Sequence, residues 1–182
     1  SRLLNTEDKL KTFIDSVVLF EEKLGCVFLQ MHENFNPKDF DRLKEFVLKF
    51  PKGIPLAVEV RNEKWFSVDE FSESLFQFLE ENNIVNVIVD TAGRRDMLHF
   101  RLTNDTAFVR FVGANHPSDY DRLNDWIKVI KEWRSAGLNK LYFFIHQNIE
   151  VESPMLATHF IMNLNETFNL KLPFPQKQIS LF

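Results

Sequence analysis

Residues 56–65 read LAVEVRNEKW, an apolar run that carries a glutamate, continues into an arginine and ends at a tryptophan. Four other apolar runs also carry or end in polar side chains, and they are CVFLQ (26–30), VNVIVD (85–90), TAFVRFV (106–112) and LYFFIH (141–146). Stretches with helical periodicity separate most of these runs. Nearly continuous apolar strands that alternate with helices are typical of a parallel sheet covered on both faces. We therefore expect functional groups at the carboxyl ends of the strands, where loops converge.

The number of strands decides between two parallel architectures. A complete (β/α)₈ barrel usually needs about 250 residues and eight strands, whereas this chain has 182 residues and five predicted strands. The chain also opens with a helical pattern that begins near Leu10, before any strand. An open five-stranded sheet explains the count but not this helix. We predict an α/β fold, a partial TIM-like (β/α) barrel with flanking helices, as one domain over 1–182 with a C-terminal tail at 173–182.

The composition narrows the class of protein. The formal net charge is −4 and the sequence pI is about 5.8, which does not favour a nucleic-acid-binding face. A single cysteine, Cys26, allows no disulfide within the chain, as is typical of a reducing compartment. No apolar stretch approaches the roughly 18 residues that span a bilayer, so we expect a cytoplasmic protein with no membrane partner. Uncovered strand edges can pair with a second copy, which leaves a homo-oligomer open.

Glu59 and Arg61 form the sharpest polar group. Alternation along a strand places both side chains on one side of the sheet. A glutamate buried beside an arginine stays ionised and can accept hydrogen bonds from a substrate. A structural ion pair that plugs the barrel mouth is the other interpretation. Trp65, in the loop that follows, either stacks on a ligand or covers the core.

Asp90 ends the third apolar run. An aspartate at this position is a common general base or metal ligand, and the alternative is a turn aspartate that binds nearby backbone amides. Together with Glu59 it predicts an acid/base pair or a pair of ligands for a divalent metal. The chain has no H-x-H, H-E-x-x-H or cysteine cluster and no glycine-rich phosphate loop, so neither the metal nor a nucleotide has a strong signature.

Other polar side chains fall at the same predicted edge. Arg110 lies inside an apolar strand, and a buried arginine needs an anion, which is either a carboxylate of the chain or a substrate phosphate or carboxylate. His146 and Gln147 close the fifth strand, and Gln30 ends the first. We assign these residues to substrate binding, with a satisfied polar group as the alternative for each.

A basic loop and a short C-terminal motif complete the candidates. The loop between the third and fourth runs is either a phosphate-binding patch or a solvated loop, and its basic residues are Arg94, Arg95, His99 and Arg101. The chain ends in a Q-x-x-L-F pattern made by Gln178, Leu181 and Phe182. This pattern is similar to the pentapeptide with which bacterial DNA-processing proteins bind the replication sliding clamp, where apolar side chains enter a pocket. A tail docked on its own domain is the alternative.

The order of these motifs resembles the YecE-like family, domain of unknown function 72. The matching segments are VEVRNEKW (58–65), Asp90, VRFVG (109–113) and FFIHQN (143–148). Glu59, Arg61 and Trp65 match the family's E-x-R-x-x-x-W pattern. The resemblance implies a TIM-barrel-like fold with no established activity. Because family members run longer at the N-terminus, it also implies that this chain corresponds to their C-terminal part.

The sequence departs from the family pattern at three places. Val112 stands where the R-x-H-G element has a histidine, and His32 and Glu33 stand where the Q-x-P-P-x-F element has prolines. The asparagines usual after the last strand are reduced to Gln147-Asn148. The resemblance therefore assigns no fixed catalytic role to positions 32, 112 and 147.

Three functional interpretations follow. The first is a metal-assisted or acid/base hydrolase of the phosphodiesterase type, in which Glu59 and Asp90 act on a phosphorylated or otherwise anionic substrate. The second is a non-catalytic binding module that the C-terminal peptide links to DNA repair. The third is a structural polar plug, formed by Glu59, Arg61, Asp90 and Arg110.

Overall fold

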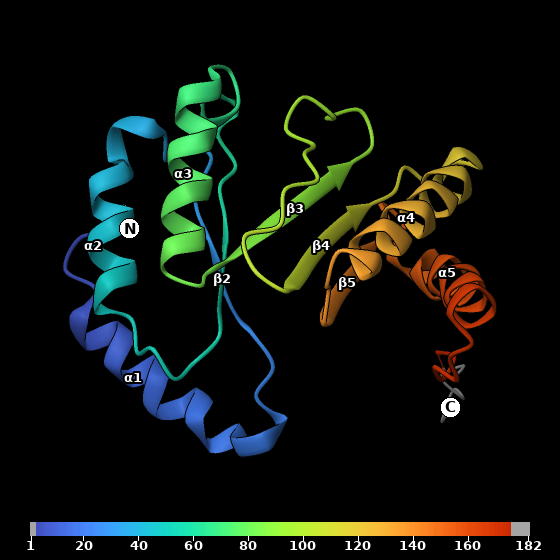
Figure 1. The fold of residues 1–182 in the computed structure, drawn as a ribbon, viewed down its shortest axis with the longest axis horizontal. Helices are drawn as coiled ribbons and strands as arrows, with labels where there is room; N and C mark the ends of the chain where they lie inside the picture. Colours follow the sequence, from blue (N-terminus) through green and yellow to red (C-terminus); the bar gives the residue numbers. More distant parts are fainter. Residues whose placement is uncertain (1–2, 176–182) are drawn as a thin grey trace.

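A computed structural model describes residues 3–175 and shows five parallel strands in the order β1-β2-β3-β4-β5 (Figure 1). The strands are β1 (Val27–Gln30), β2 (Leu56–Glu59), β3 (Val85–Thr91), β4 (Thr106–Val112) and β5 (Lys140–His146). Each strand pairs with the next one along the chain, so every crossover runs in the same direction around the sheet. The predicted α/β half-barrel with flanking helices is confirmed.

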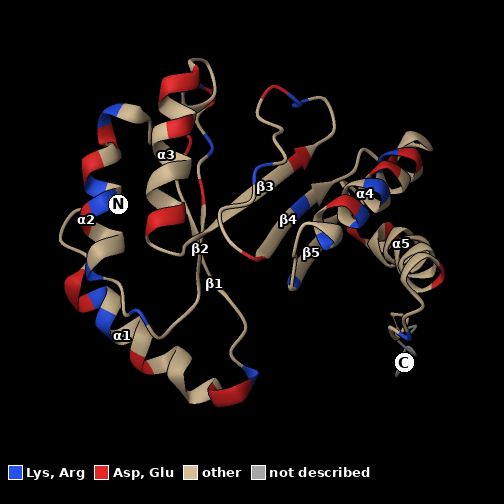
Figure 2. Cartoon of the chain, viewed as in Figure 1, with Lys and Arg blue, Asp and Glu red and all other residues tan. Residues whose placement is uncertain are grey.

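Five α-helices flank the sheet, and the charged side chains are spread along them while the strands are mostly uncharged (Figure 2). The helices are α1 (Glu7–Val17), α2 (Phe40–Lys49), α3 (Asp69–Glu81), α4 (Ser118–Ser135) and α5 (Ser153–Phe168). Short 3₁₀ turns are η1 (Val18–Lys23), η2 (Pro37–Asp39), η3 (Glu63–Trp65) and η4 (Glu150–Glu152). No helix within residues 3–175 is long and apolar enough to cross a lipid bilayer.

Two apolar clusters fill the space between the sheet and its helices. Helices α2 and α3 cover β1 and β2, with Leu43 and Leu75 fully buried against Val58. Helices α4 and α5 cover β3 and β4, where Ile88 and Phe111 are fully buried. In Figure 1, α2 and α3 lie beside β2 at the left and α4 and α5 lie beside β4 and β5 at the right, so the two pairs cover opposite ends of the sheet. We call the face of the sheet that meets the helices the outer face.

The opposite face of the strands, which we call the inner face, holds a third and smaller cluster. Ala57, Val85, Val87 and Phe108 are its buried members. Because side chains alternate along a strand, the residues two positions later in β2 and β4, including Glu59, lie on this face too. At the carboxyl ends of the strands, the inner face therefore forms the part of the barrel interior in which we expect a binding site.

The element boundaries follow the sequence closely except at the N-terminus. The helical pattern that begins near Leu10 divides into α1 and η1, and Glu21 takes a positive φ of 49° within η1. Leu19 and Phe20 are exposed rather than packed. The link between β3 and β4 contains no helix, as its irregular sequence predicts. The candidate clamp-binding residues Gln178, Leu181 and Phe182 lie outside the described residues.

Candidate functional site

Four polar side chains meet on the inner face, and we call Gln30, Glu59, Arg61 and Arg110 the inner cluster. Glu59 Oε2 accepts a hydrogen bond from Arg110 Nη1 at 2.6 Å, and its Oε1 accepts one from Gln30 Nε2 at 3.0 Å. Arg61 Nε lies 3.6 Å from the same Oε1. Glu59 is almost fully buried, and a buried carboxylate needs charged partners of this kind. Strands β1, β2 and β4 thus contribute to one site.

Strand register explains how residues so distant in sequence meet. Gln30 lies beside Glu59 in the β1–β2 ladder. Arg110 comes from β4, and β3 lies between it and Glu59. The inner-face residues of β3 near this level are Val87 and Val89, and their short apolar side chains leave the guanidinium room to cross β3. The long arginine side chain therefore bridges two non-adjacent strands.

Charge and exposure distinguish the two arginines from the carboxylate they contact. The side chain of Arg61 is 50% exposed and that of Arg110 is 23% exposed, whereas Glu59 is 1% exposed. Each guanidinium has five N–H donors, and only one donor of each contacts Glu59. Two positive groups surround one negative group, so the cluster carries an excess positive charge with unused donors. Such an arrangement suits a phosphate or a carboxylate.

The remaining residues of the fifth strand's end are not part of the inner cluster. His146 Nδ1 lies 3.3 Å from Glu150 Oε1 and is about half exposed. The pKa of Glu150 is lowered, first by the hydrogen bond from Ser153 and then by His146. Gln147 is buried, and its Oε1 accepts a hydrogen bond from the Asn115 backbone N–H at 3.0 Å. Through its Oε1, Gln147 therefore holds the loop that follows β4, as in the alternative interpretation of a satisfied polar group.

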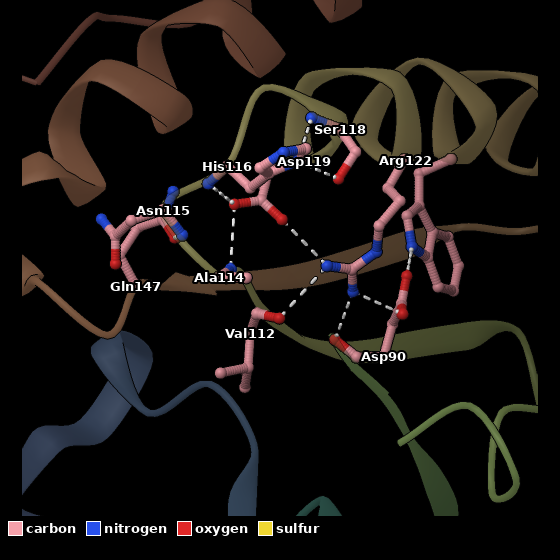
Figure 3. Close-up of polar contacts among 10 residues, drawn as sticks. Asp90, Val112, Ala114, Asn115, His116, Ser118, Asp119, Arg122 and Gln147 are labelled. Atoms are coloured by element: carbon pink, nitrogen blue, oxygen red, sulfur yellow. Dashed lines mark hydrogen bonds and ion pairs between the residues drawn. The ribbon is translucent and has the colours of Figure 1, made fainter. Parts of the chain in front are cut away.

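Asp90 belongs to a different group of side chains, the outer cluster of Asp90, Asp119, Arg122 and Trp126 (Figure 3). Arg122 Nη2 donates to Asp90 Oδ1 and to the Asp90 carbonyl, and Trp126 Nε1 donates to Oδ2 at 2.8 Å. Asp90 thus faces helix α4, together with Ile88, and not the inner face. The predicted pairing of Glu59 with Asp90 is wrong, because alternation along β3 places Val87 and Val89, rather than Asp90, on the inner side.

The outer cluster fixes the loop between β4 and α4. Arg122 Nη1 donates to Asp119 Oδ1 at 3.1 Å and to the Val112 carbonyl at 3.3 Å. Asp119 Oδ2 accepts hydrogen bonds from the backbone N–H groups of Ala114 and His116. Figure 3 shows Arg122 between the ends of β3 and β4. Sequence reasoning missed Arg122, although its spacing from Asp119 and Trp126 places all three on one face of a helix.

The structure decides between the two roles that the sequence allows for Trp65. Trp65 is fully buried, and its Nε1 donates to the Phe35 carbonyl at 3.0 Å while Phe40 packs edge-on against its ring. Stacking on a ligand is therefore wrong for Trp65, and its role in covering the core is confirmed. The aromatic ring of Trp65 therefore does not contribute to the inner cluster.

The basic loop does not form a patch. Arg94 pairs with Asp96, and Arg101 pairs with Glu80. The His99 ring packs against Phe66 and Phe76, and burial lowers its pKa to about 4. An uncharged, packed histidine and two neutralised arginines leave Arg95 as the loop's remaining cation, so phosphate binding by this loop has little support.

A metal has no ready set of ligands in the described part of the chain. Residues 3–175 contain no group of three or more histidine, cysteine, aspartate or glutamate side chains that could hold a metal ion. The inner cluster offers one carboxylate that two guanidinium groups already neutralise. The donor set therefore favours an anion over a cation.

Comparisons with known proteins agree with the fold. The family model described as "Protein of unknown function DUF72" matches residues 1–179. The chain is 23% identical to the UPF0759 protein YecE of Escherichia coli strain K12, over 99% of the chain and 73% of that protein. A crystal structure of a DUF72 family protein from Enterococcus faecalis has a TM-score of 0.72 at 21% identity, and covers 97% of this chain and 71% of its own. A DUF72 family protein from Thermotoga maritima has a TM-score of 0.71 at 21% identity, with 88% and 66% covered.

Proposed function

The chain belongs to the DUF72 family of proteins of unknown function, and we propose that its inner cluster binds a phosphorylated or otherwise anionic small molecule. The observation that carries this proposal is the charge balance at the carboxyl ends of the strands, where Arg61 and Arg110 surround the single carboxylate of Glu59. Parallel α/β barrels bind their ligands at this edge. A guanidinium that is partly exposed and has unused donors can bind a phosphate or carboxylate in a bidentate manner.

The reaction that we propose for this ligand is hydrolysis, with Glu59 as the general base. Glu59 is the one carboxylate of the inner cluster, and so it is the group available to take a proton from an attacking water. In the unliganded structure its two oxygens are occupied by Arg110 and Gln30. An anion that draws Arg110 toward itself would release one carboxylate oxygen, so binding would prepare the base.

Calorimetric titration tests the binding step. We expect inorganic phosphate and a sugar phosphate to bind the unmodified protein, and Arg110→Gln to lower both affinities by about tenfold or more, as expected for a lost charged hydrogen bond. Arg61→Gln should show a smaller loss, since its side chain is more exposed. Arg134→Gln, a change on helix α4, is the matched control and should leave both affinities unchanged. Equal affinities for all four proteins would contradict the proposal.

Turnover tests the reaction separately. A panel of phosphodiesters and sugar phosphates is incubated with the unmodified protein and with Glu59→Gln, each with and without divalent metals. We expect the unmodified protein alone to release inorganic phosphate from a sugar phosphate or to cleave a phosphodiester to a phosphomonoester and an alcohol. If every rate equals the uncatalysed background while phosphate still binds, the protein is a binding protein and the hydrolase proposal is contradicted.

The sliding-clamp interpretation rests on the sequence of residues 178–182 and concerns a different part of the chain. We propose it as an attachment that is independent of the inner cluster. Deleting residues 178–182 should abolish capture of the chain on immobilised sliding clamp without changing the affinity for phosphate. A chain that binds the clamp equally well without these residues, or never binds it, would remove this interpretation.

A further inference from the structure

Three phenylalanines form a continuous aromatic layer on the inner face, next to the inner cluster. Phe28, Phe108 and Phe144 precede Gln30, Arg110 and His146 by two positions on their strands. The Phe28 and Phe108 ring centroids are 5.4 Å apart at an interplanar angle of 20°, and the Phe108 and Phe144 centroids are 4.9 Å apart at 25°. These values describe stacked rings. The layer therefore runs across the sheet from β1 to β5.

The two phenylalanines at the ends of this layer are exposed to solvent. Phe28 is 38% exposed and Phe144 is 44% exposed, although Phe108 between them is buried. Strand interiors in a covered sheet normally bury such rings, which contribute large apolar areas. Exposed apolar surface of this kind is typical of ligand-binding grooves and interaction sites. The inner face therefore offers a ring-binding surface.

The same surface is continuous with the positive charge of the inner cluster. The guanidinium carbon of Arg110 lies 5.6 Å from the centroid of the Phe28 ring, within the range of a cation–π contact. One side chain thus contacts Glu59, the carboxylate of the inner cluster, and also an exposed aromatic ring. A ligand that covers the rings would bring its other end to Arg110.

The geometry points to a ligand that joins a flat aromatic ring to a phosphate through a sugar-sized spacer, the chemistry of a nucleoside monophosphate. We infer that its ring stacks on the exposed Phe144, at the end of the layer, while its phosphate binds Arg61 and Arg110, an inference that rests on the proposed anion site. Phe144 pairs with Arg110 in the β4–β5 ladder, and neighbouring strands lie about 4.8 Å apart, so one ligand can contact both the ring and the guanidinium. Stacking on an aromatic side chain tolerates any base, so this surface selects for a ring rather than for one base.

Three ligands separate the ring from the phosphate. Adenosine 5′-monophosphate carries both, ribose 5-phosphate lacks the ring, and adenosine lacks the phosphate. We expect the unmodified protein to bind the monophosphate about tenfold more tightly than ribose 5-phosphate, and adenosine most weakly. Phe144→Leu should remove most of this tenfold gap and leave the affinity for ribose 5-phosphate unchanged.

Phe71→Leu is the matched control, because Phe71 is exposed to a similar extent on helix α3, and it should leave the gap intact. Equal affinities of the unmodified protein for the monophosphate and ribose 5-phosphate would overturn the ring inference while the anion site stands. Absence of binding by both phosphates would overturn both proposals. Sedimentation tests another occupant, and a dimer that Phe144→Leu converts to a monomer would assign the face to a second copy and overturn the inference.

Discussion

The inner and outer clusters are built from the same chemical groups at the same edge of the sheet, but they have opposite charge balances. Two guanidinium groups surround Glu59 in the inner cluster, whereas two carboxylates, those of Asp90 and Asp119, surround the single guanidinium of Arg122 in the outer cluster. An approaching anion is therefore attracted by the first cluster and repelled by the second. The distinction between a binding site and a structural support lies in this balance.

Exposure of the cation separates the clusters as clearly as charge does. Glu59 and Asp90 are equally buried, so the carboxylates do not differ. The Arg122 side chain is only 11% exposed and spends its Nη donors on Asp90, Asp119 and the Val112 carbonyl. The arginines of the inner cluster reach solvent. A buried cation whose Nη donors all bind the protein supports the fold, and one that is partly exposed can bind a ligand.

Removing the Asp90 carboxylate from the outer cluster should have the largest effect on stability. Asp90→Ala leaves Arg122 buried beside Phe111 with one carboxylate fewer and leaves the Trp126 N–H without its acceptor. Breaking a buried pair from one side costs about 3–5 kcal/mol. We expect a loss of that size in the free energy of unfolding, measured by urea denaturation, with no change in the phosphate affinity of the folded protein.

Asp125→Ala is the control for this change. Asp125 pairs with Lys128 on the exposed surface of the same helix, and exposed pairs contribute about 0–1 kcal/mol. A large loss of stability in this control would show that helix α4 responds to any lost charge. A loss of phosphate binding in folded Asp90→Ala would break the separation of the two clusters.

A pH titration tests His99, a partly buried polar group that belongs to neither cluster. Burial lowers the pKa of His99 from 6.5 to about 4, so between these values the unfolded chain binds a proton that the native chain does not. The free energy of unfolding should therefore fall as the pH decreases from about 6.5 to about 4, and its full value is kept above pH 6.5. One pKa unit corresponds to about 1.4 kcal/mol. Because His99 is only partly buried, we expect a loss somewhat below the full value of the shift, about 2–3 kcal/mol, measured by thermal denaturation at a series of pH values.

His99→Gln identifies the source of this pH dependence. Glutamine does not titrate and can still accept a hydrogen bond from the Asn86 amide that contacts the His99 ring. The variant should be less stable than the unmodified protein near neutral pH but should lose less stability on acidification. Parallel pH profiles of the two proteins would assign the acid sensitivity to other groups.

The sequence predicted the strands and the inner cluster because both depend on local patterns. Apolar runs define strands, and Glu59, Arg61, Gln30 and Arg110 each mark a strand end or interrupt an apolar run. The face on which Asp90 lies could not be predicted, because every other residue of VNVIVD except one is apolar and alternation gives no preferred side. A shift of one residue between strands exchanges the two faces. The register between β2 and β3 is a tertiary property.

The outer cluster was missed for a related reason. Arg122 lies in the second turn of α4, where an exposed arginine is ordinary. The sequence shows that Asp119, Arg122 and Trp126 share a helical face, but it does not show that this face meets the end of β3. A long side chain acquires its role only when the helix is placed against a particular strand.

A methyl group at Gly113 should disturb the loop that the outer cluster holds. A Cβ there would collide with Gln147 Oε1 and lie 2.8 Å from Asp119 Oδ2. Gln147 must then move and release the Asn115 N–H that it accepts from. We expect Gly113→Ala to lower the free energy of unfolding by about 2 kcal/mol, within the range for overpacking. Gly53→Ala, where no atom lies within 4 Å of the added Cβ, is the control, and equal effects in the two variants would contradict the collision.

Glu59→Gln should have the smallest effect on stability and the most informative effect on binding. The amide oxygen of glutamine can still accept from Arg110, and both arginines reach solvent, so we expect a loss of about 1 kcal/mol in urea denaturation. Removing the only negative charge of the inner cluster leaves two guanidinium groups uncompensated. Phosphate should then bind about fivefold more tightly by calorimetry, and the gain should diminish at high salt.

Opposite directions of change make Glu59→Gln decisive for the role of the carboxylate. If Glu59 balances the charge of Arg110 in the binding step, phosphate binds more tightly to the variant. If Glu59 is also the general base, the same variant loses turnover. A structural plug instead predicts a loss of about 3 kcal/mol, as for a broken buried pair, with no change in any affinity. Weaker phosphate binding would mean that Glu59 itself contacts the ligand. The inner cluster would then resemble the outer cluster, because it would need its carboxylate to hold its arginines in place.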